Sequence, residues 1–563
     1  MEKFAKKAAE ILSSALKTPF DAHEFSTPPD RALADFAFPC FKLSKEQRKS
    51  PAEVAKALVA SIPTSSEFTI AAVGPYVNFT VKPEAAVQLL SQDMSAKLPA
   101  NTKGKWVLEY SSPNIAKPFN IYHLRGTALG AALARVGKHR GFETIRINHL
   151  GDWGTQYGKL SVALKMYEKE MPANPGIPDL VNIYVKFHQD LEKDPSLEDQ
   201  AREAFVLLEK NDPTMTTLWK KCVKIAMDEF MRTYKRLDID FDYYWGESHY
   251  KDLLKPLIAQ LKQQGVLVES EGALVIPVTD RDGRELPPCI MEKSDGASIY
   301  ATRDVAAAIY RHEKFNFDRM TYIVGGEQKM HFQQVFGALR VMGYKWESKC
   351  EHVPTGLYRF KDAKMSTRKG NFVTLEEVLE QAKDKAKELM KAREGLNLSE
   401  KELDATAEAV AVGAVVFHDL STDPARDVEF DLDRVVSFEG ETGPYLQYAY
   451  VRCLSILRKA SEKNLKPDLK FASMLVHPAE ITLIKQLGHF GLHLDRTLTF
   501  SKASQLCNYL IDVTKDFGHF YRECHVIGDD VELSQARLAL VDATRAILAK
   551  GLELLGIPRP EKM

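Results

Sequence analysis

Residues 105–148 constrain the fold of this chain more than any other segment. A strand-like run, KWVLEY, is followed by a long polar turn, a helical pattern that ends at Gly141, and a second strand-like run, ETIRINHL. Strand, helix and strand in this order form a βαβ unit, in which both strands lie parallel in one sheet. The segment therefore predicts an α/β domain that binds ligands at the carboxyl ends of its strands.

The turn SSPNIAKPFNIYHLRGT, residues 111–127, gathers polar side chains at that ligand-binding end. The helix that follows points free N–H groups and the positive end of its dipole at the turn. Lys117 and His123 add further donors at the same place. These features suit a chain of phosphates, although Asn and Pro are also ordinary turn residues.

A chain of 563 residues is too long for one hydrophobic core, and its pattern divides it into four parts. Residues 1–98 predict a small N-terminal α/β domain, because helical and strand patterns alternate there. Residues 104–375 predict a Rossmann-type catalytic domain with a parallel sheet and a helical insertion at 158–240. Residues 376–435 predict a helical connector, and 436–563 predict an all-α C-terminal bundle.

Composition and targeting signals exclude several classes of protein. The formal net charge is -1, so a nucleic-acid partner needs local basic patches. The seven Cys include no C-x-x-C pair, which argues against zinc and disulfides and suits the cytoplasm. The longest apolar run, near 409–417, is too short to span a bilayer, and the N-terminal stretch has no signal-peptide core.

The segment KMSTRKG, residues 364–370, is a second candidate phosphate-binding element. It is short and very basic, ends in glycine and follows a strand-like run. Taken alone, such a loop is more simply a solvated turn. Its occurrence in the same chain as a His-containing strand-to-helix turn favours phosphate binding.

These segments together resemble the arginyl-tRNA synthetases, which are class I aminoacyl-tRNA synthetases. The stretch EYSSPNIAKPF…HLRGT resembles the arginine-site segment that runs into the HIGH motif, and KMSTRKGN resembles the KMSKS loop. NHLGDWGTQYGKL, residues 148–160, resembles a block typical of this family. FEGETGPYLQYAYVR and the ending LGIPRPEKM resemble the start and end of its anticodon-binding domain. The likeness covers essentially the whole chain, in order.

The resemblance implies that ATP activates arginine as arginyl-adenylate, and that the arginyl group then moves to the 3′ end of its tRNA. The implied catalytic residues are His123, Lys364 and Lys117. The implied arginine-binding set is Glu109, Ser111, Ser112, Asn114, His123, Glu247, Tyr300, Asp304 and Gln328. The implied ATP-binding set is Asn120, Tyr122, His123, His331, Lys364, Met365, Ser366, Arg368 and Lys369. The implied tRNA-binding set is Tyr445, Gln447, Tyr448, Arg452, Arg458 and Lys459.

The implied partners are the tRNA for arginine, L-arginine and ATP, which enters with Mg²⁺ as a substrate. No tightly bound cofactor, zinc or other metal site and no membrane are expected. A cytoplasmic monomer is expected.

Elementary chemistry supports several of these roles. A guanidinium is planar and always charged, so it is best read by carboxylates. Tyr300 and Asp304 stand four apart, and on a helix they share one face. The aromatic and basic side chains that begin at Tyr445 suit unpaired bases and phosphates, although an amphipathic helix with core tyrosines explains the pattern too. A basic cluster at 42–49 is either a solvated face or, by resemblance, a contact with the tRNA elbow.

Three positions depart from the family pattern. Asn120 stands at the first His of HIGH, Tyr122 at its Gly, and Thr367 at the second Lys of the KMSKS loop. A side chain at Tyr122 either crowds the adenine or turns aside. The first two departures motivate an alternative, a synthetase-like RNA-binding protein that no longer activates arginine.

A second alternative is another class I synthetase, such as the cysteine or the glutamate enzyme. The former would require a Cys-based zinc site, and the latter would require cations around the substrate side chain. Asp152 and Trp153 receive no single role, since packing and substrate contact are both compatible with the pattern.

Overall fold

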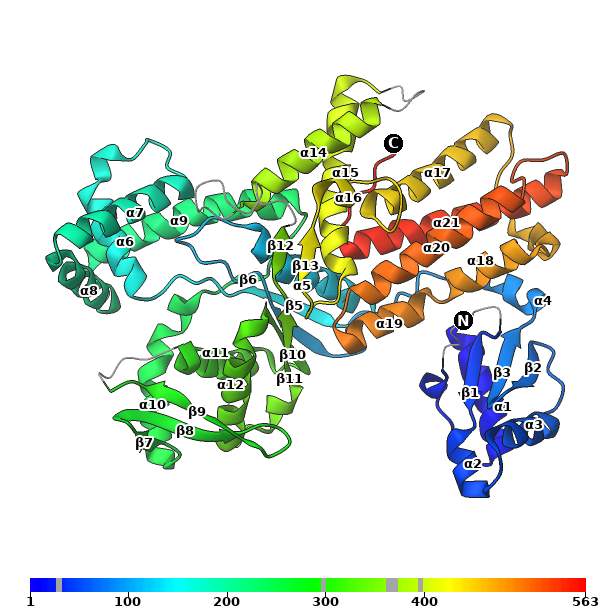
Figure 1. Ribbon diagram of the computed structural model, residues 1–563, viewed down its shortest axis with the longest axis horizontal. Coiled ribbons are helices and arrows are strands. Elements are labelled where there is room, and N and C mark those ends of the chain that lie inside the picture. Colours follow the sequence, from blue (N-terminus) through cyan, green and yellow to red (C-terminus); the bar gives the residue numbers. More distant parts are fainter. Residues whose placement is uncertain (27–32, 295–299, 361–372, 393–397) are drawn as a thin grey trace.

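The computed structural model describes residues 1–26, 33–294, 300–360, 373–392 and 398–563 (Figure 1). Its central element is a five-stranded sheet with the strand order β11-β10-β4-β5-β6. The strands are β4 (Lys105–Glu109), β5 (Glu143–Asn148), β6 (Tyr243–Tyr244), β10 (Arg319–Gly325) and β11 (Cys350–Thr355). Every neighbouring pair is parallel, so the predicted parallel sheet is confirmed.

Both faces of this sheet are covered by helices, which is why β4 is almost entirely buried. α5 (Ile121–His139) packs closely on one face, because Gly130 and Gly137 leave room for strand side chains. A Cβ at Gly130 would lie 2.1 Å from Cγ of Tyr110. On the other face, α10 (Lys251–Gln264), α11 (Tyr300–Phe315) and α12 (Lys329–Val341) form a second core with β4 and β5.

Two additions interrupt the βαβ framework. The helices of the first are α6 (Thr155–Met166), α7 (Ile177–Lys193), α8 (Ser196–Glu209) and α9 (Pro213–Arg236). They occupy the region predicted as a helical insertion. The second is an antiparallel sheet of β7 (Val268–Ser270), β8 (Ala273–Thr279) and β9 (Glu285–Glu292) beside α12. In Figure 1 both additions lie on the left of the molecule, with the helical addition above the antiparallel sheet.

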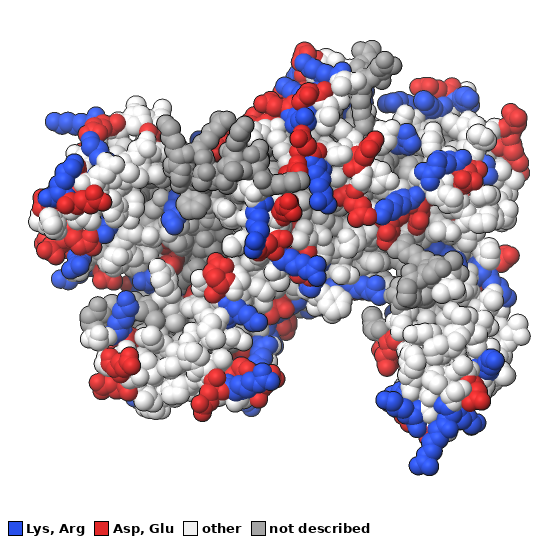
Figure 2. All heavy atoms as spheres, viewed as in Figure 1, with Lys and Arg blue, Asp and Glu red and all other residues white. Residues whose placement is uncertain are grey.

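The N-terminal unit is a small α/β domain that lies beneath α18 (Pro478–Gly488) in Figure 1. Its helices are α1 (Glu2–Leu16), α2 (Phe41–Gln47), α3 (Pro51–Ser61) and α4 (Pro83–Ala86), and its antiparallel strands are β1 (Phe36–Pro39), β2 (Phe68–Val73) and β3 (Tyr76–Val81). The basic cluster lies partly on α2 rather than on a loop. Figure 2 shows Lys and Arg gathered at this tip of the domain, where the side chains of Lys42, Lys45, Arg48 and Lys49 are exposed.

The C-terminal part is a bundle of helices. They are α14 (Leu375–Lys391), α15 (Glu400–Ser421), α16 (Leu432–Val435), α17 (Gly443–Glu462), α18 (Pro478–Gly488), α19 (Phe490–Phe500), α20 (Ser504–Glu523) and α21 (Val531–Leu555). The connector is not purely helical, because β13 (Val428–Phe430) pairs in parallel with β12 (Tyr358–Phe360). No helix among the described residues is long and apolar enough to cross a membrane.

Two buried arginines, one in α5 and one directly after it, join the catalytic unit to the C-terminal helices. Arg125 forms an ion pair with Asp419 of α15 at 3.1 Å and donates to three backbone carbonyls at 423–426. Arg140, one residue past α5, pairs with Asp495 of α19 at 2.6 Å and lies 3.5 Å from Glu2. The helix that follows β4 is therefore fixed at both ends by other units of the chain.

Candidate active site

The turn after β4 has a strained backbone. Ser111 and Ser112 have φ values of 76° and 49°, in the left-handed region that side chains with a Cβ rarely occupy. A non-glycine residue in this conformation costs on the order of 1–3 kcal/mol of folding free energy. It persists only where contacts with the surrounding structure hold the backbone in that conformation. Here Tyr234 and Thr127 hold the Ser111 hydroxyl, each at 2.8 Å.

His123 and Asn120 cap α5 reciprocally. The Asn120 side-chain oxygen accepts from the His123 backbone N–H at 3.3 Å, and Nδ1 of His123 accepts from the Asn120 backbone N–H at 3.0 Å. Because Nδ1 accepts, the imidazole proton lies on Nε2. Burial and then the nearby Lys117 lower the pKa of His123 to about 4, so the ring is a neutral donor at pH 7. Asn120 is thus the N-cap of the helix, a position that favours Asn.

The residues on either side of 361–372 both contact the start of α5. Thr374 forms a β-bridge with Asn120, and the Ile121 backbone N–H donates to the Val373 carbonyl at 3.3 Å. On the other side, the rings of Tyr122 and Tyr358 meet edge-to-face with centroids 6.3 Å apart. Tyr122 therefore turns toward β12, and its side chain remains 37% exposed. The predicted residues Lys364, Met365, Ser366, Arg368 and Lys369 lie outside the described residues.

A cluster of acids and bases lies beyond the carboxyl ends of β4, β5 and β10. Glu247 accepts from Nη1 of Arg303 at 2.6 Å, and Asp304 is 2.5 Å from Nε2 of His331 and 3.9 Å from Nε2 of His149. Burial raises the pKa of Glu247 more than Arg303 lowers it. Burial also acts to raise the pKa of Asp304, but the hydrogen bond from His331 and nearby cations outweigh it, so this pKa is lowered.

Two residues of the predicted arginine and ATP sets have partners within the protein at this cluster. Glu109 is only 3% exposed and is ion-paired with the fully buried Arg311. Its carboxylate neutralises a cation that α11 buries against the sheet, and its contact with arginine stays a prediction. His331, which the sequence places in the ATP-binding set, contacts Asp304, and its role toward ATP stays a prediction. His149 was not predicted as a site residue, although it lies in the block at 148–160 that resembles the family.

Asp152, for which the sequence offered no role, holds the segment that carries Glu247. Its carboxylate accepts from the backbone N–H and the hydroxyl of Ser248, at 2.9 and 2.6 Å. A Cβ at Gly246 would lie 2.4 Å from that carboxylate, so glycine is required for the approach. Trp153 packs edge-on against Phe205 and Trp219. Packing, rather than substrate contact, accounts for both residues of the block.

Asn114 is anchored to the same block. Its Oδ1 accepts from the Ala116 backbone N–H at 2.9 Å and from the Tyr157 hydroxyl at 3.2 Å. Asn114 also forms a β-bridge with Gly151. The side-chain orientation of Asn114 is therefore fixed before any ligand arrives.

The other predicted residues in this area are held by fewer contacts within the protein. Ser112 has a buried hydroxyl without a hydrogen-bond partner among the described residues. Lys117 and Gln328 are exposed. Tyr300 begins α11, as its predicted helical spacing with Asp304 requires, but its side chain is 66% exposed and its ring lies 5.4 Å from the Arg303 guanidinium.

The predicted tRNA-binding residues of α17 differ in exposure. Arg458 and Lys459 are exposed, and Tyr445, Tyr448 and Arg452 are half-buried. Gln447 is fully buried, and its amide donates to the carbonyls of Ala409 and Pro558 at 2.9 and 2.8 Å. The prediction that Gln447 reads a base is therefore wrong, because its amide joins α17 to α15 and to the chain end.

Comparison with known proteins identifies the family. Residues 85–432 match the model "tRNA synthetases class I (R), catalytic domain", residues 2–81 match "Arginyl tRNA synthetase N terminal domain", and residues 446–563 match "DALR anticodon binding domain". An arginine–tRNA ligase of Clostridioides difficile is 41% identical over 544 residues, 95% of each chain. One of Halothermothrix orenii is 39% identical over the full length of both. The chain belongs to the arginyl-tRNA synthetases.

Solved structures agree with this assignment. The arginyl-tRNA synthetase of Thermus thermophilus superposes with a TM-score of 0.84 at 26% identity, over 99% of this chain and 100% of that one. The predicted fold class is confirmed. The predicted membership of a class I synthetase family, which uses ATP as a substrate, is confirmed as well. The two departures at Asn120 and Tyr122 occur within a member of that family rather than outside it.

Proposed function

We propose that the protein ligates L-arginine to its tRNA at this site through an arginyl-adenylate. The observation that supports arginine over other amino acids is the pair of carboxylates Glu247 and Asp304. Arg303 holds one oxygen of Glu247, and His331 holds one oxygen of Asp304. The second oxygen of each carboxylate then accepts from the planar guanidinium of the substrate, because a carboxylate has several acceptor positions.

The other end of arginine is assigned to Asn114 and Gln328. Because Oδ1 of Asn114 already accepts from Ala116 and Tyr157, its NH₂ group is the part that donates to the substrate carboxylate. The exposed Gln328 stands at the end of β10 and contacts the substrate backbone from the neighbouring strand.

ATP is assigned to the start of α5. Its phosphates take hydrogen bonds from Nε2 of His123 and from the helix N-terminus, and Lys117 supplies positive charge that the neutral imidazole lacks. Lys364 and its basic neighbours are assigned to the pyrophosphate side. Adenylate formation is an in-line attack on the α-phosphate, so positioning and charge carry the catalysis.

Mg²⁺ enters with ATP as part of the substrate in this proposal. Among the described residues no three His, Cys, Asp or Glu side chains are grouped as metal ligands. The tRNA is held by Tyr445, Tyr448, Arg452, Arg458 and Lys459, and by the basic tip of the N-terminal unit. The seven cysteines are all buried and unpaired, which supports our proposal of a cytoplasmic protein, and we expect a monomer.

The test is attachment of labelled arginine to total tRNA, with the other amino acids as controls. We expect arginine alone to be attached, and only when ATP is present. Tight binding of tRNA without attachment of any amino acid would favour the synthetase-like RNA-binding alternative. Attachment of a different amino acid would overturn the assignment of Glu247 and Asp304. Light scattering at working concentration checks the monomer.

A further inference from the structure

Arg303 of α11 provides the only ion pair that Glu247 forms among the described residues. Its Nη1 donates to one carboxylate oxygen at 2.6 Å. Both side chains are largely buried, with 11% and 13% of their surfaces exposed. Nε of Arg303 is buried as well and has no hydrogen-bond partner in the part of the chain that the structure describes. The pair is therefore formed through a single contact.

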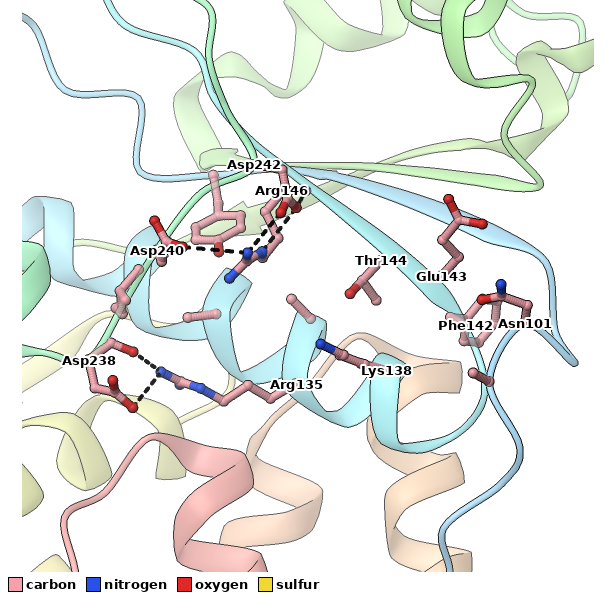
Figure 3. Close-up of a pocket in the computed structure, with 15 residues that line it drawn as sticks. Asn101, Arg135, Lys138, Phe142, Glu143, Thr144, Arg146, Asp238, Asp240 and Asp242 are labelled. Atoms are coloured by element: carbon pink, nitrogen blue, oxygen red, sulfur yellow. Dashed lines mark hydrogen bonds and ion pairs between the residues drawn. The ribbon is translucent and has the colours of Figure 1, made fainter.

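This pair differs from an ion pair whose two members satisfy each other. Arg146 and Asp242, elsewhere in the catalytic unit, are joined through two nitrogens and two oxygens, at 3.0 and 2.8 Å (Figure 3). Arg303 instead contacts one oxygen of Glu247, and the second oxygen accepts from no residue that the structure describes. The carboxylate is thus held by a cation and remains open to a further donor.

The surroundings of Glu247 are unfavourable for a negative charge. Burial is the largest effect and raises the pKa of Glu247, and the carboxylates of Asp304 and Asp152 act in the same direction. Arg303 is the strongest influence that lowers this pKa, followed by His149. Asp152 is tied to the same loop by its hydrogen bonds, so its like charge stays close to Glu247.

Three further titratable groups lie around the same cluster. Arg311 is ion-paired with Glu109, and His331 is bound to Asp304. Tyr157 of α6 stays neutral, because burial raises its pKa well above the ordinary value. None of the three supplies a positive charge that is not already engaged with another acid.

We propose that Arg303 is a positioning residue that keeps the Glu247 carboxylate ionised and oriented for arginine at neutral pH. It acts through Glu247 and requires no contact with the substrate. A buried carboxylate without a cation takes up a proton rather than remain charged, and a protonated Glu247 offers the substrate guanidinium only a weaker, neutral acceptor. This inference rests on the proposed function, because it concerns the same pocket.

The experiment compares two variants that remove the charge with one that keeps it. Arg303→Met retains an apolar stem, Arg303→Gln retains an N–H donor, and Arg303→Lys retains a positive charge. The control is Arg146→Met, which breaks the ion pair of Figure 3. Attachment of arginine to tRNA at saturating ATP and tRNA gives kcat/KM for arginine from about pH 6 to about pH 9, and the pH profile reports ionisation in the free enzyme.

We expect the acid limb of this profile to move to higher pH by about one unit or more in Arg303→Met and Arg303→Gln. Relative to the wild type, their kcat/KM should fall about tenfold or more at the acid end and much less at the alkaline end. Arg303→Lys and Arg146→Met should keep the acid limb of the wild type. Either uncharged variant alone carries the test if the other does not fold.

Calorimetry of arginine binding near pH 7 adds a readout that does not depend on turnover. Titrations in two buffers with different ionisation enthalpies measure the protons that binding releases. The uncharged variants should release up to about one proton more per arginine than the wild type, because the bound guanidinium favours the ionised form of Glu247.

A loss of kcat/KM that is the same at every pH, without extra proton release, would assign Arg303 to packing and overturn the inference. Wild-type kinetics in both uncharged variants would overturn it too. A wild type that neither binds nor attaches arginine would instead overturn the proposed function, and this inference with it.

Discussion

At the scale of single residues, the neutral state of His123 decides how charge is distributed in the ATP site. The imidazole is buried and lies near Lys117, so it donates a hydrogen bond without carrying charge. The positive charge on the phosphates must then come from lysines and from the end of α5. Asn120, which stands at the first His of the HIGH motif, is uncharged as well, and it caps the helix instead.

The lowered pKa of His123 predicts an acid-sensitive contribution to stability. The unfolded chain binds a proton at His123 near the ordinary pKa of 6.5, whereas the folded chain does so only near 4. The unfolded state is therefore favoured as the pH falls from 7 to 5, and this residue alone should lower the free energy of unfolding by about 2 kcal/mol. Urea unfolding of the wild type and of His123→Gln at both pH values measures it. Other buried histidines contribute equally to both proteins, so an equal pH dependence would contradict the pKa of His123.

Asp304 should set the specificity for arginine. In Asp304→Asn the guanidinium loses a charged partner, so kcat/KM for arginine should fall by a factor that corresponds to about 2–5 kcal/mol. The KM for ATP should remain nearly unchanged. Pyrophosphate exchange and tRNA charging measure these parameters, and Asp252→Asn, at a carboxylate that is 86% exposed, is the matched control. Near-normal arginine kinetics in the Asp304 variant would remove this residue from the pocket.

Tyr122 should have a small effect on ATP binding. Its ring turns toward Tyr358, so it does not need to share space with the adenine. We expect Tyr122→Gly to change the KM for ATP by less than about tenfold, or ~1.4 kcal/mol. Tyr122→Phe, which keeps the ring contact, should match the wild type. An inactive wild type that Tyr122→Gly with Asn120→His restores would show that this tyrosine blocks the site.

At the scale of elements, α5 shows what the sequence predicts well and what it does not. The helix and its flanking strands were predictable because hydrophobic periodicity and turn residues are local signals. The partners of Glu247 and Glu109 were not, since Arg303 and Arg311 lie far along the chain and only the fold brings them close. The capping role of Asn120 was predictable from local sequence, because Asn directly before a helical pattern favours the N-cap position.

The capping role of Asn120 predicts a graded series of stabilities. Asn120→Ser keeps a good N-cap and should change the free energy of unfolding little, whereas Asn120→Ala should cost about 1 kcal/mol. Denaturant unfolding of the three proteins provides the comparison. A loss as large in Asn120→Ser as in Asn120→Ala would mean that the amide acts elsewhere than on the helix N-terminus.

At the scale of the whole molecule, the C-terminal helices pack against the catalytic unit and stabilise the position of α5. Arg125 and Arg140 of the α5 region reach α15 and α19, and α21 packs on α5. A truncation near residue 435 would therefore expose buried surface of α5 and α15, and it cannot separate tRNA recognition from folding. Surface substitutions on α17 are the better test.

Exposed cations of α17 should contribute to tRNA affinity mainly through phosphates. We expect the double variant Arg458→Gln and Lys459→Gln to bind tRNA more weakly and to reduce the slope of log affinity against log salt by roughly 1–2. The matched control is Lys255→Gln with Arg284→Gln, two exposed cations of the catalytic unit. Filter binding at several salt concentrations measures the slope. Equal slopes in the wild type and the α17 variant would place the phosphate contacts in another part of the molecule.

The bridge between Asn120 and Thr374 also has a consequence for synthesis on the ribosome. The start of α5 is translated early, but its partner strand segment emerges from the exit tunnel only after some 250 further residues. At 5–20 residues per second this delay is on the order of tens of seconds. During that interval the nascent chain carries its first nucleotide motif without the segment that completes it. Pausing within this interval, or a chaperone that binds there, would act on an incomplete site.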